Sequence, residues 1–406
     1  MIQIAVLGFG TVGSGVVELI DKNQDTIRSR FPEGVHVKYI LDIREFPGNP
    51  YADRIVHDIN IILEDPEISI VCETMGGKEP AHTFSKAALE KGKSVCTSNK
   101  ELVAAFGPAL IRTAAEHNCS YMFEASVGGG IPIIRPLLSA LTQEKITSIL
   151  GILNGTTNYI MTRMENEGMS FEEVLKIAQE KGYAERNPEA DVEGHDACRK
   201  IAILSSLVAG KTVRYEDIPC EGISRITTED MKYARSMHMA VRLLGMNRQA
   251  DDGSLYVRTA PFLVPEEHPL HNVSGVFNAV FVHGNMVDNL MFYGRGAGKL
   301  PTASAVVADV LECARSIGRH VPVCWSGEVM ELADPYSESR QFFVRVDASE
   351  KDLALSLFKA AQEVKAEGLE GEFAFVTEEQ TEAEFERKAK ALSTLKNRIR
   401  LLDLEK

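Results

Sequence analysis

Short apolar runs and amphipathic stretches alternate along the first third of the chain. The apolar runs at 2–7, 35–41, 68–72, 94–97 and 120–124 predict strands. Between them, apolar residues at helical spacing, such as Val16, Val17 and Ile20, and the stretch 81–91 predict helices. Strands that alternate with helices are typical of a doubly wound parallel α/β sheet, which binds ligands at the carboxyl ends of its strands.

The pattern changes after about residue 135. Further strands are predicted at 146–153, 255–264, 276–283 and 289–293, and helices are predicted from Asn154, from His195 and over 228–244. The helix from His195 places Ala197, Ile201 and Leu204 on one apolar line. This order predicts an α+β mixed sheet with helices on one face. A helix over 306–317 is expected to return to the first domain and close its cofactor cleft.

The tail alternates in a similar way. Strand, helix, strand, helix and strand are predicted at 342–346, 353–364, 373–376, 382–392 and 399–402. We therefore predict three parts. A dinucleotide-binding domain spans 1–135 and is rejoined by 296–330, a mixed-sheet domain spans 136–295, and a small α+β module spans 340–406.

Composition narrows the function. The net charge of −14 argues against nucleic acid and against anionic membranes as partners. The seven cysteines lack paired spacing, which indicates reduced thiols in a cytosol. The apolar start turns glycine-rich almost at once, so it predicts a strand and not a signal peptide, and no run is long enough to span a bilayer. We expect a cytoplasmic protein.

Glycines follow the first predicted strand. Gly8, Gly10 and Gly13 stand between that strand and the first helix, where a dinucleotide fold cradles the pyrophosphate. The second strand ends at Asp42, an acidic residue suited to a ribose hydroxyl, and Arg44 follows, a residue suited to a 2′-phosphate. The preference between NAD and NADP stays open.

Other strand ends carry candidate chemistry. The turns 74–77 and 97–100 fall at carboxyl ends of predicted strands, and Lys100 is either a surface residue or a cation facing the nicotinamide. Gly298 lies in a glycine-rich turn before a helix, which again favours phosphate. The segment 124–132, with three consecutive glycines, predicts either a hard-cation site that includes Glu124 or a hinge between domains.

The stretch 182–200 is rich in carboxylates and leads into an apolar helix. Asp196 and Lys200 are one helical turn apart, which suits an ordinary ion pair or, beside a carboxylate-rich loop, a site for a zwitterion. The amides at Gly155 and Thr156 begin another helix and suit a substrate carboxylate, unless Asn154 simply caps that helix. The histidines lack metal-ligand spacing, so no catalytic zinc is expected.

Seven blocks in order resemble the homoserine dehydrogenase family over roughly residues 1 to 330: GFGTVGSGV, ETMGG, TSNKELVA, FEASVGGGIPIIRPL, GILNGTTNYI, GYAERNPEADVEGHDACRK and GRGAGKLPTASAVVAD. The resemblance implies reversible oxidation of L-homoserine to L-aspartate 4-semialdehyde with NAD or NADP, on the way to threonine, methionine and isoleucine. It implies a Rossmann domain, a mixed-sheet substrate and dimerisation domain, and a cytoplasmic homodimer or higher homo-oligomer.

The resemblance also assigns roles by motif. Lys100 and Lys200 match the family lysines near the reacting hydroxyl, either of which is the general acid/base. Glu185 and Asp196 match carboxylates that orient the substrate ammonium, with Gly155 and Thr156 as further substrate contacts. A monovalent cation, sodium or potassium, is implied at Glu124, Val127, Gly129 and Ile131. The implied cofactor contacts are Gly8, Gly10, Thr11, Val12, Gly13, Asp42, Arg44, Thr74, Lys100 and Gly298.

One position and one turn depart from the family pattern. Leu41 stands where members that use NADP often have an arginine, and Arg44 comes later. The tail is similar to the ACT regulatory module of some members, but its turn reads Asp347-Ala348-Ser349-Glu350 without Pro-Gly. The tail is therefore either an amino-acid sensor or a structural, dimerising element.

Two other functions compete. Aspartate-semialdehyde dehydrogenase or another aldehyde dehydrogenase needs a cysteine nucleophile beside a base, and no cysteine lies in an evident catalytic turn. A catalytically silent NAD(P)-binding sensor protein predicts nucleotide binding without turnover. It gives no reason for Lys100, Asp196 and Lys200 to converge.

Overall fold

The computed structural model describes residues 1–250, 252–359 and 361–403. It divides the chain into two compact units. The first unit holds Met1–Glu144, Ala202–Tyr215 and Gly294–Met330, and the second holds Lys145–Ile201, Glu216–Tyr293 and Glu331–Lys406. The helix α9 (His195–Ala209) begins in the second unit and ends in the first.

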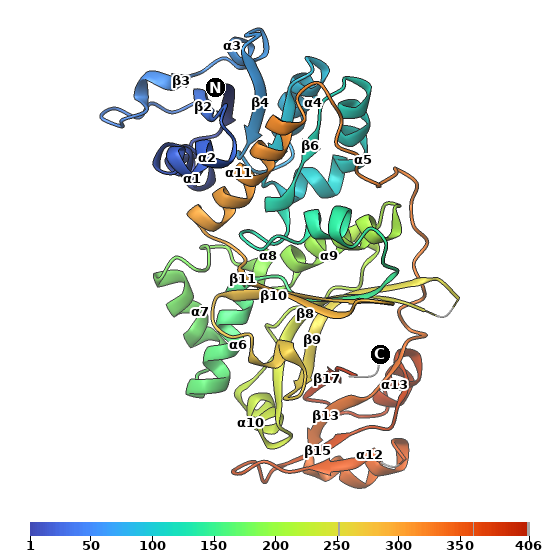
Figure 1. Cartoon of the computed structure of the whole chain (residues 1–406). Helices are drawn as coiled ribbons and strands as arrows, with labels where there is room; N and C mark the ends of the chain where they lie inside the picture. Colours follow the sequence, from blue (N-terminus) through green and yellow to red (C-terminus); the bar gives the residue numbers. More distant parts are fainter. Residues whose placement is uncertain (251, 360, 404–406) are drawn as a thin grey trace. The chain divides into compact units, whose positions relative to one another are not determined.

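The first unit is a six-stranded parallel sheet in the order β3-β2-β1-β4-β5-β6 (Figure 1). Its strands are β1 (Ile2–Leu7), β2 (Val35–Leu41), β3 (Ile55–Val56), β4 (Ile68–Glu73), β5 (Ser94–Thr97) and β6 (Tyr121–Met122). Its helices are α1 (Thr11–Lys22), α2 (Gln24–Arg30), α3 (Ile59–Leu63), α4 (Ala81–Glu90), α5 (Lys100–Glu116) and α11 (Lys299–Arg315). This strand order is that of dinucleotide-binding sheets, so the predicted parallel α/β sheet is confirmed.

The last helix of this unit packs against the first. A Cβ atom at Gly15 of α1 would lie 2.9 Å from the Lys299 carbonyl oxygen and 3.0 Å from the Ala303 Cβ, so only glycine allows the two helices to approach this closely. Val306 and Val310 of α11 join the same apolar core as Val6 of β1. The orange helix α11 in Figure 1 is thus an integral part of the unit formed by the blue strands.

The second unit contains a nine-stranded mixed sheet in the order β11-β10-β7-β8-β9-β17-β13-β15-β14. The strands are β7 (Ile146–Ile152), β8 (Met239–Gln249), β9 (Leu255–Pro265), β10 (Phe277–Gly284), β11 (Asp288–Arg295), β13 (Phe342–Asp347), β14 (Gln362–Val364), β15 (Glu372–Val376) and β17 (Asn397–Leu401), while β12 (Ser339–Arg340) pairs with β16 (Gln380–Thr381). The remaining helices are α6 (Gly155–Glu167), α7 (Phe171–Glu180), α8 (Glu189–Val192), α10 (Thr228–Ser236), α12 (Lys351–Leu357) and α13 (Glu382–Ala389).

The tail strands extend this sheet. Strand β17 pairs in parallel with β9 through Arg400 and Leu401, whereas β17 pairs antiparallel with β13 and β9 pairs antiparallel with β8. The red strands in Figure 1 therefore continue the yellow ones. Phe342, Phe358, Phe375 and Phe385 form a separate apolar cluster in the tail.

The helix predicted at 382–392 ends at Ala389. Four further predicted elements were wrong in extent for reasons that the structure shows. The predicted helix 228–244 ends at Ser236, and its last residues form β8 because they are paired on both sides, by β7 and β9. The strand predicted at 120–124 stops at Met122, because a 3-10 turn at Glu124–Ser126 leads the backbone away from the sheet. Helix α11 begins at Lys299, earlier than predicted, since Pro301 fits a first helical turn where its missing N–H is not needed.

The fourth is the predicted helix 353–364, of which position 360 lies outside the described residues. Its described part ends at Leu357, because the buried Phe358 leaves the helical conformation and 362–364 pair with β15 instead. The loop predicted before His195 also contains the short helix α8.

Candidate functional site

A cavity of about 570 Å³ opens at the carboxyl ends of β1, β2 and β4 in the first unit. It lies where ligands bind to doubly wound sheets. Five residues predicted to contact the cofactor line it, together with hydrophobic and polar neighbours. The lining residues are Gly8, Gly10, Leu41, Asp42, Ile43, Arg44, His57, Asp58, Ile59, Thr74, Met75, Pro80 and Phe84.

The glycine turn is shaped by its backbone. Gly8 has φ of +90°, which side chains rarely adopt, and a Cβ atom at Gly13 would lie 1.9 Å from the Gly8 carbonyl oxygen. By contrast, a Cβ atom at Gly10, the N-cap of α1, would meet nothing within 4 Å. Open space before a helix N-terminus, with no capping side chain, fits a bound phosphate. Thr11 and Val12 begin α1 directly after it.

Asp42 and Arg44 form an ion pair at the end of β2. The Asp42 carboxylate accepts hydrogen bonds from the Phe9 amide at 2.8 Å and from the Arg44 Nη2 at 3.0 Å. The bond from Arg44, opposed by burial, lowers the pKa of Asp42 well below its usual range. The Arg44 side chain is 58% exposed, and its guanidinium lies 5.0 Å from the centre of the Phe46 ring. The same two residues thus offer an acceptor and a cation to one cavity.

The loops after β4 and β5 are joined by a buried carboxyl group. The Thr97 hydroxyl donates to Glu73 at 2.6 Å, and burial raises the pKa of Glu73. Asn99 caps α5 by accepting from the Leu102 amide and donates to the Gly77 carbonyl oxygen at 2.6 Å. Lys100 is the first residue of α5 and is half-buried. Lys100 is therefore held at the carboxyl edge of the sheet by a rigid pair of loops.

The segment 124–132, predicted as a cation site or a hinge, is mostly buried, and its acidic residue is fully hydrogen-bonded to backbone amides. The Glu124 carboxylate accepts hydrogen bonds from the amides of Ile133, Ile134 and Arg135 at 2.6 to 2.8 Å. The Glu124 amide in turn donates to Asp309. Burial, with the nearby charge of Glu124, raises the pKa of Asp309 to about 7.

The backbone carbonyl residues of that predicted site lie in the same segment. Val127, Gly129 and Ile131 are buried, and Gly129 has φ of +56°. A Cβ atom at Gly129 would lie 2.3 Å from the Gly296 carbonyl oxygen, so glycine is needed for this close approach. Gly298, the N-cap of α11, has φ of +119°. No group of three or more histidine, cysteine or acidic side chains suited to a metal occurs within the described residues.

The second unit buries a lysine among polar partners. The Lys200 Nζ donates to the Leu153 carbonyl oxygen at 2.8 Å and pairs with the Asp196 Oδ2 at 2.9 Å. The Asn154 amide group donates to the same Asp196 oxygen at 2.9 Å and to Asp191 at 2.7 Å. Lys200 is only 8% exposed and Asp196 only 5%. An exposed intrahelical pair is ruled out, and this chain of contacts is called the Lys200 network below.

The other predicted substrate residues lie near its start. Asn154 caps α6 by accepting from the Thr157 amide at 2.9 Å, as the alternative interpretation predicted, and also enters the Lys200 network. Gly155 and Thr156 form the first turn of α6, and the Thr156 hydroxyl donates to the Tyr183 carbonyl oxygen at 2.6 Å. Glu185 is exposed, with its backbone carbonyl bonded to Gln179, so it is not one of the buried members of the network.

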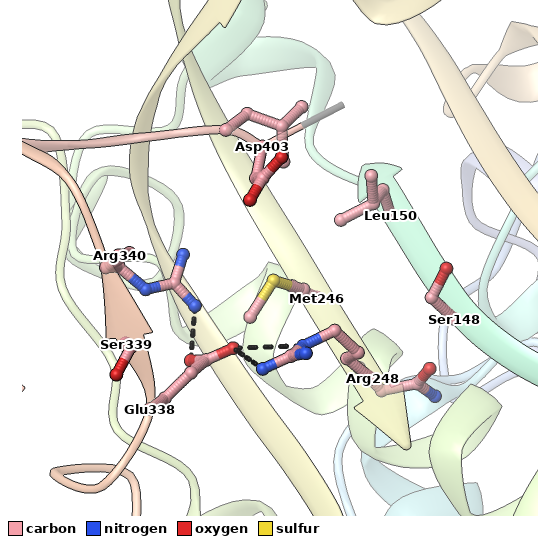
Figure 2. Close-up of a pocket in the computed structure, with 10 residues that line it drawn as sticks. Ser148, Leu150, Met246, Arg248, Glu338, Ser339, Arg340 and Asp403 are labelled. Carbon is pink, nitrogen blue, oxygen red and sulfur yellow. Dashed lines mark hydrogen bonds and ion pairs between the residues drawn. The ribbon is translucent and has the colours of Figure 1, made fainter. Parts of the chain in front are cut away.

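A smaller cavity lies between the tail and the sheet of the second unit (Figure 2). Glu338 accepts a hydrogen bond from Arg248 at 3.2 Å and also forms an ion pair with Arg340. These three charged side chains thus pair with one another. Its volume of about 30 Å³ holds little more than a water molecule. It suits neither a nucleotide nor an amino acid.

Sequence reasoning missed several contributors. Asn154 was considered only as a cap, Asp191 was grouped only with its neighbouring carboxylates, and the Leu153 carbonyl was not considered, yet all three belong to the Lys200 network. His57, which lines the cofactor cavity and whose Nδ1 lies 2.7 Å from the Asp42 carbonyl oxygen, was also missed. The sequence did carry a signal for Asn154, because it lies between the end of a strand and the start of a helix, where ligands often bind in α/β proteins.

Two family models match the chain. The model of the homoserine dehydrogenase NAD-binding domain covers residues 8–124, and the homoserine dehydrogenase model covers residues 132–311. The chain belongs to the homoserine dehydrogenase family. It is therefore an oxidoreductase with an NAD(P)-binding domain, and nothing favours the silent sensor.

Curated relatives and solved structures agree with this family. The homoserine dehydrogenase of Synechocystis is 45% identical over 76% of this chain and 72% of the relative, and that of Bacillus subtilis is 41% identical over 76% and 72%. The homoserine dehydrogenase structure from Thiobacillus denitrificans has a TM-score of 0.90 at 33% identity and covers 99% of this chain and 98% of its own. A hyperthermophilic archaeal homoserine dehydrogenase in complex with NADPH has a TM-score of 0.65 at 27% identity, over 80% of this chain and 99% of its own.

Within the residues that the structure describes, no helix has the length and apolar character required to cross a bilayer.

Proposed function

We propose that the chain interconverts L-homoserine and L-aspartate 4-semialdehyde by hydride exchange with NAD or NADP, with proton transfer by lysine. The observation that carries the proposal is the Lys200 network. A lysine held inside the protein by a carboxylate and a backbone carbonyl is a positioned acid/base and not a solvated charge. The bound nicotinamide supplies the hydride acceptor, and the protein supplies binding and orientation.

Lys200 is the first candidate for the proton transfer. An ammonium group donates up to three hydrogen bonds, and Leu153 and Asp196 account for two. The third is suited to the terminal hydroxyl of homoserine. Lys100, at the edge of the parallel sheet, is the second candidate, and we leave open which lysine transfers the proton. Hydride transfer needs no covalent nucleophile, only the carbon, the ring and one proton acceptor in place.

The amino-acid end of homoserine would be held by groups of the second unit. Asp196, with Glu185 from the preceding loop, would accept from the substrate ammonium, because a carboxylate is an acceptor of opposite charge and Asp196 lies beside Lys200. The amides at Gly155 and Thr156 begin α6, where the helix dipole favours the substrate carboxylate.

The cofactor would lie in the first unit. Its pyrophosphate would face the turn at Gly8, Gly10 and Gly13 and the start of α1, beside Thr74 and Gly298. The ribose would reach Asp42, and Arg44 would receive a 2′-phosphate if NADP is bound. Asp42 and Arg44 form an ion pair with each other. NAD would bind the pair through Asp42 and NADP through Arg44, so the preference between the two nucleotides stays open.

Further parts of the proposal rest on the resemblance. A sodium or potassium ion would be held by Glu124 and the carbonyl groups of Val127, Gly129 and Ile131. The dinucleotide-binding domain would span 1–135 with 296–330, the substrate and dimerisation domain 136–295, and an ACT-like module 340–406. We further propose a cytoplasmic homodimer or larger homo-oligomer in threonine, methionine and isoleucine biosynthesis.

The test is an assay of the purified full chain with L-homoserine and either NAD⁺ or NADP⁺, followed through reduced nucleotide, with and without threonine. We expect turnover with at least one nucleotide and reversal with L-aspartate 4-semialdehyde. Nucleotide binding without turnover would contradict the proposal. Inhibition by threonine would support an amino-acid-sensing tail, and its absence would favour a structural tail.

A further inference from the structure

Two cysteines of the second unit meet where α9 begins. Cys198 lies within α9, between Asp196 and Lys200, and Cys220 lies in the loop that precedes α10. The Cys198 amide donates to the Gly194 carbonyl oxygen at 2.9 Å, so Cys198 lies one helical turn after Gly194, and a Cβ atom at Gly194 would lie 3.2 Å from the Cys220 Sγ. The contact between the two thiols raises the pKa of Cys198 and lowers that of Cys220. Neither residue belongs to the proposed nucleotide or homoserine site.

The loop holds Cys220 firmly against the helix start. The Glu221 amide donates to the Thr259 carbonyl oxygen at 2.8 Å, and the Thr259 amide donates to Pro219 at 2.9 Å, so the loop is bonded to β9 on both sides of Cys220. The Cys220 thiol donates a hydrogen bond to the Glu193 carbonyl oxygen at 3.3 Å, which holds the sulfur at the helix start and favours its neutral form. A Cβ atom at Gly194 would lie 3.2 Å from this sulfur, so the glycine leaves it room.

The surroundings favour a thiolate at Cys220. Its Sγ lies 3.9 Å from the His195 Nδ1 and faces the first turn of α9, and helix N-termini and histidines stabilise thiolates. The pKa of Cys220 is lowered overall, chiefly by the contact with Cys198 and also by the charge of Arg199. Partial burial and the carboxylates of Glu193 and Glu221 act in the opposite direction. Cys220 is also partly exposed and lines a cavity of about 540 Å³, through which a small oxidant can reach it.

A second pair of thiols shows why this environment matters. The Cys96 and Cys313 sulfurs lie 3.7 Å apart in the first unit, but both residues are completely buried. Burial raises the pKa of Cys96, which favours its neutral thiol, and neither sulfur is accessible to solvent. Proximity of two thiols alone therefore does not make a reactive site. The pair of Cys198 and Cys220 differs from that of Cys96 and Cys313 because Cys220 is partly exposed to solvent and has a lowered pKa.

We propose that Cys220 is an oxidant-sensitive thiol and that Cys198 is its resolving partner. The Cys220 thiolate attacks a hydroperoxide, the O–O bond breaks, and sulfenic acid and an alkoxide or hydroxide form. The Cys198 thiol then attacks the sulfenic sulfur, its proton leaves with the hydroxyl group as water, and a disulfide forms. The hydroperoxide receives the two electrons that the thiols lose. A cellular or added thiol reverses the reaction.

The disulfide would tie α9 to the loop that contains Cys220. Its anchor in α9, Cys198, lies between Asp196 and Lys200, two members of the Lys200 network. This consequence rests on the proposed function, in which Asp196 binds homoserine and Lys200 transfers the proton. Displacement of reacting groups by about 1 Å can cost about 100-fold in rate, so we expect oxidation to reduce turnover by at least about tenfold. Nucleotide binding in the first unit should not change.

The experiment treats the full chain with one equivalent of hydrogen peroxide and maps its cysteines by mass spectrometry without reduction. We expect a peptide pair joined through Cys198 and Cys220, a mass loss of two hydrogens, and recovery of homoserine turnover with dithiothreitol. Cys220→Ser should abolish the cross-link and keep its activity under peroxide. Cys198→Ser should accumulate a dimedone-reactive sulfenic acid at Cys220. Cys324→Ser, which removes an exposed cysteine, is the matched control and should behave like the unchanged protein.

Two results would overturn the proposal. One is oxidation at Cys324 or elsewhere with no Cys198–Cys220 cross-link. The other is equal loss of activity under peroxide in the Cys220→Ser variant and the unchanged protein. A chain that does not turn over homoserine before oxidation would contradict the proposed function instead, and the mass measurement would still decide the thiol chemistry.

Discussion

The candidate cofactor site and the candidate substrate site are built from different materials. In the first unit, the cavity is bordered by a glycine turn whose shape depends on the absence of side chains at Gly8 and Gly13. In the second unit, the site is a set of buried side chains around Lys200 and Asp196. As proposed, the first would recognise phosphate through backbone N–H groups, which all residues except proline possess, and the second would recognise one small molecule through particular charged groups.

The difference predicts how each site fails. A backbone site tolerates most side-chain changes around it but not an added Cβ atom where two backbones touch. A buried polar network fails when one member is removed, because the partners keep their desolvated charges without compensation. The predictions below use changes that damage one site and spare the other.

The largest effect is expected from Lys200→Ala. Turnover should fall by about 100-fold or more, in the range of general acid/base groups. Because Lys200 belongs to the second unit, nucleotide affinity measured by NAD(P)H fluorescence should change little. Lys22→Ala, which removes an exposed lysine paired with Glu18, is the control and should keep full turnover. Near-normal turnover of the Lys200 variant would refute its role.

The next largest effect is expected from Gly13→Ala. The added Cβ atom would lie 1.9 Å from the Gly8 carbonyl oxygen and 2.7 Å from the Thr74 Oγ1, so the turn must move. Overpacking of this kind costs about 1–3 kcal/mol, and we expect nucleotide KM to rise by roughly tenfold or more. In the Gly10→Ala variant the Cβ atom meets no protein atom within 4 Å, so thermal unfolding should stay unchanged. Equal Tm values for the two variants would argue against a close-packed turn.

Asp196→Asn should chiefly weaken homoserine binding. Hydrogen bonds to charged groups contribute about 1.5–3 kcal/mol, so the KM for homoserine should rise by roughly ten- to a hundredfold. Asp191→Asn is a suitable comparison, because Asp191 contacts Asn154 but is a step further from Lys200. Steady-state kinetics at saturating nucleotide separates the two. An unchanged homoserine KM in the Asp196 variant would remove it from the substrate site.

The smallest effect is expected from Arg44→Ala. The change removes the cation next to Asp42 but leaves the glycine turn intact. Since Arg44 is largely exposed, we expect the ratio of kcat/KM for NADP to that for NAD to fall by less than about tenfold. The ratio should approach that of a pure NAD site, because Asp42 is then free to accept from a ribose hydroxyl. A constant ratio would place the selectivity elsewhere in the cavity.

Local signals in the sequence were sufficient to predict many of the strands and turns of the first unit. Strands β1, β2 and β5 begin and end where predicted, since continuous apolar runs between glycine-rich turns have few other interpretations. The glycine turn after β1 and the positions of Asp42 and Arg44 at the end of β2 were predicted for the same reason, whereas the ion pair between these two residues was not. The strand at 120–124 was predicted too long, because the amides of 133–135 that draw Glu124 out of the sheet come later in the chain.

In the second unit the sequence determined which residues are apolar, where α6 and α9 begin, and that Asp196 and Lys200 share a helix edge. Only the tertiary structure decided that residues 239–244 form a strand, because β7 and β9 must be present to pair with them. It also decided that the Leu153 carbonyl meets Lys200 and that Asn154 meets Asp196. The contact between Cys220 and Cys198 was decided in the same way. Periodicity reports the environment of one segment, whereas these contacts join segments far apart in the chain and exist only after folding.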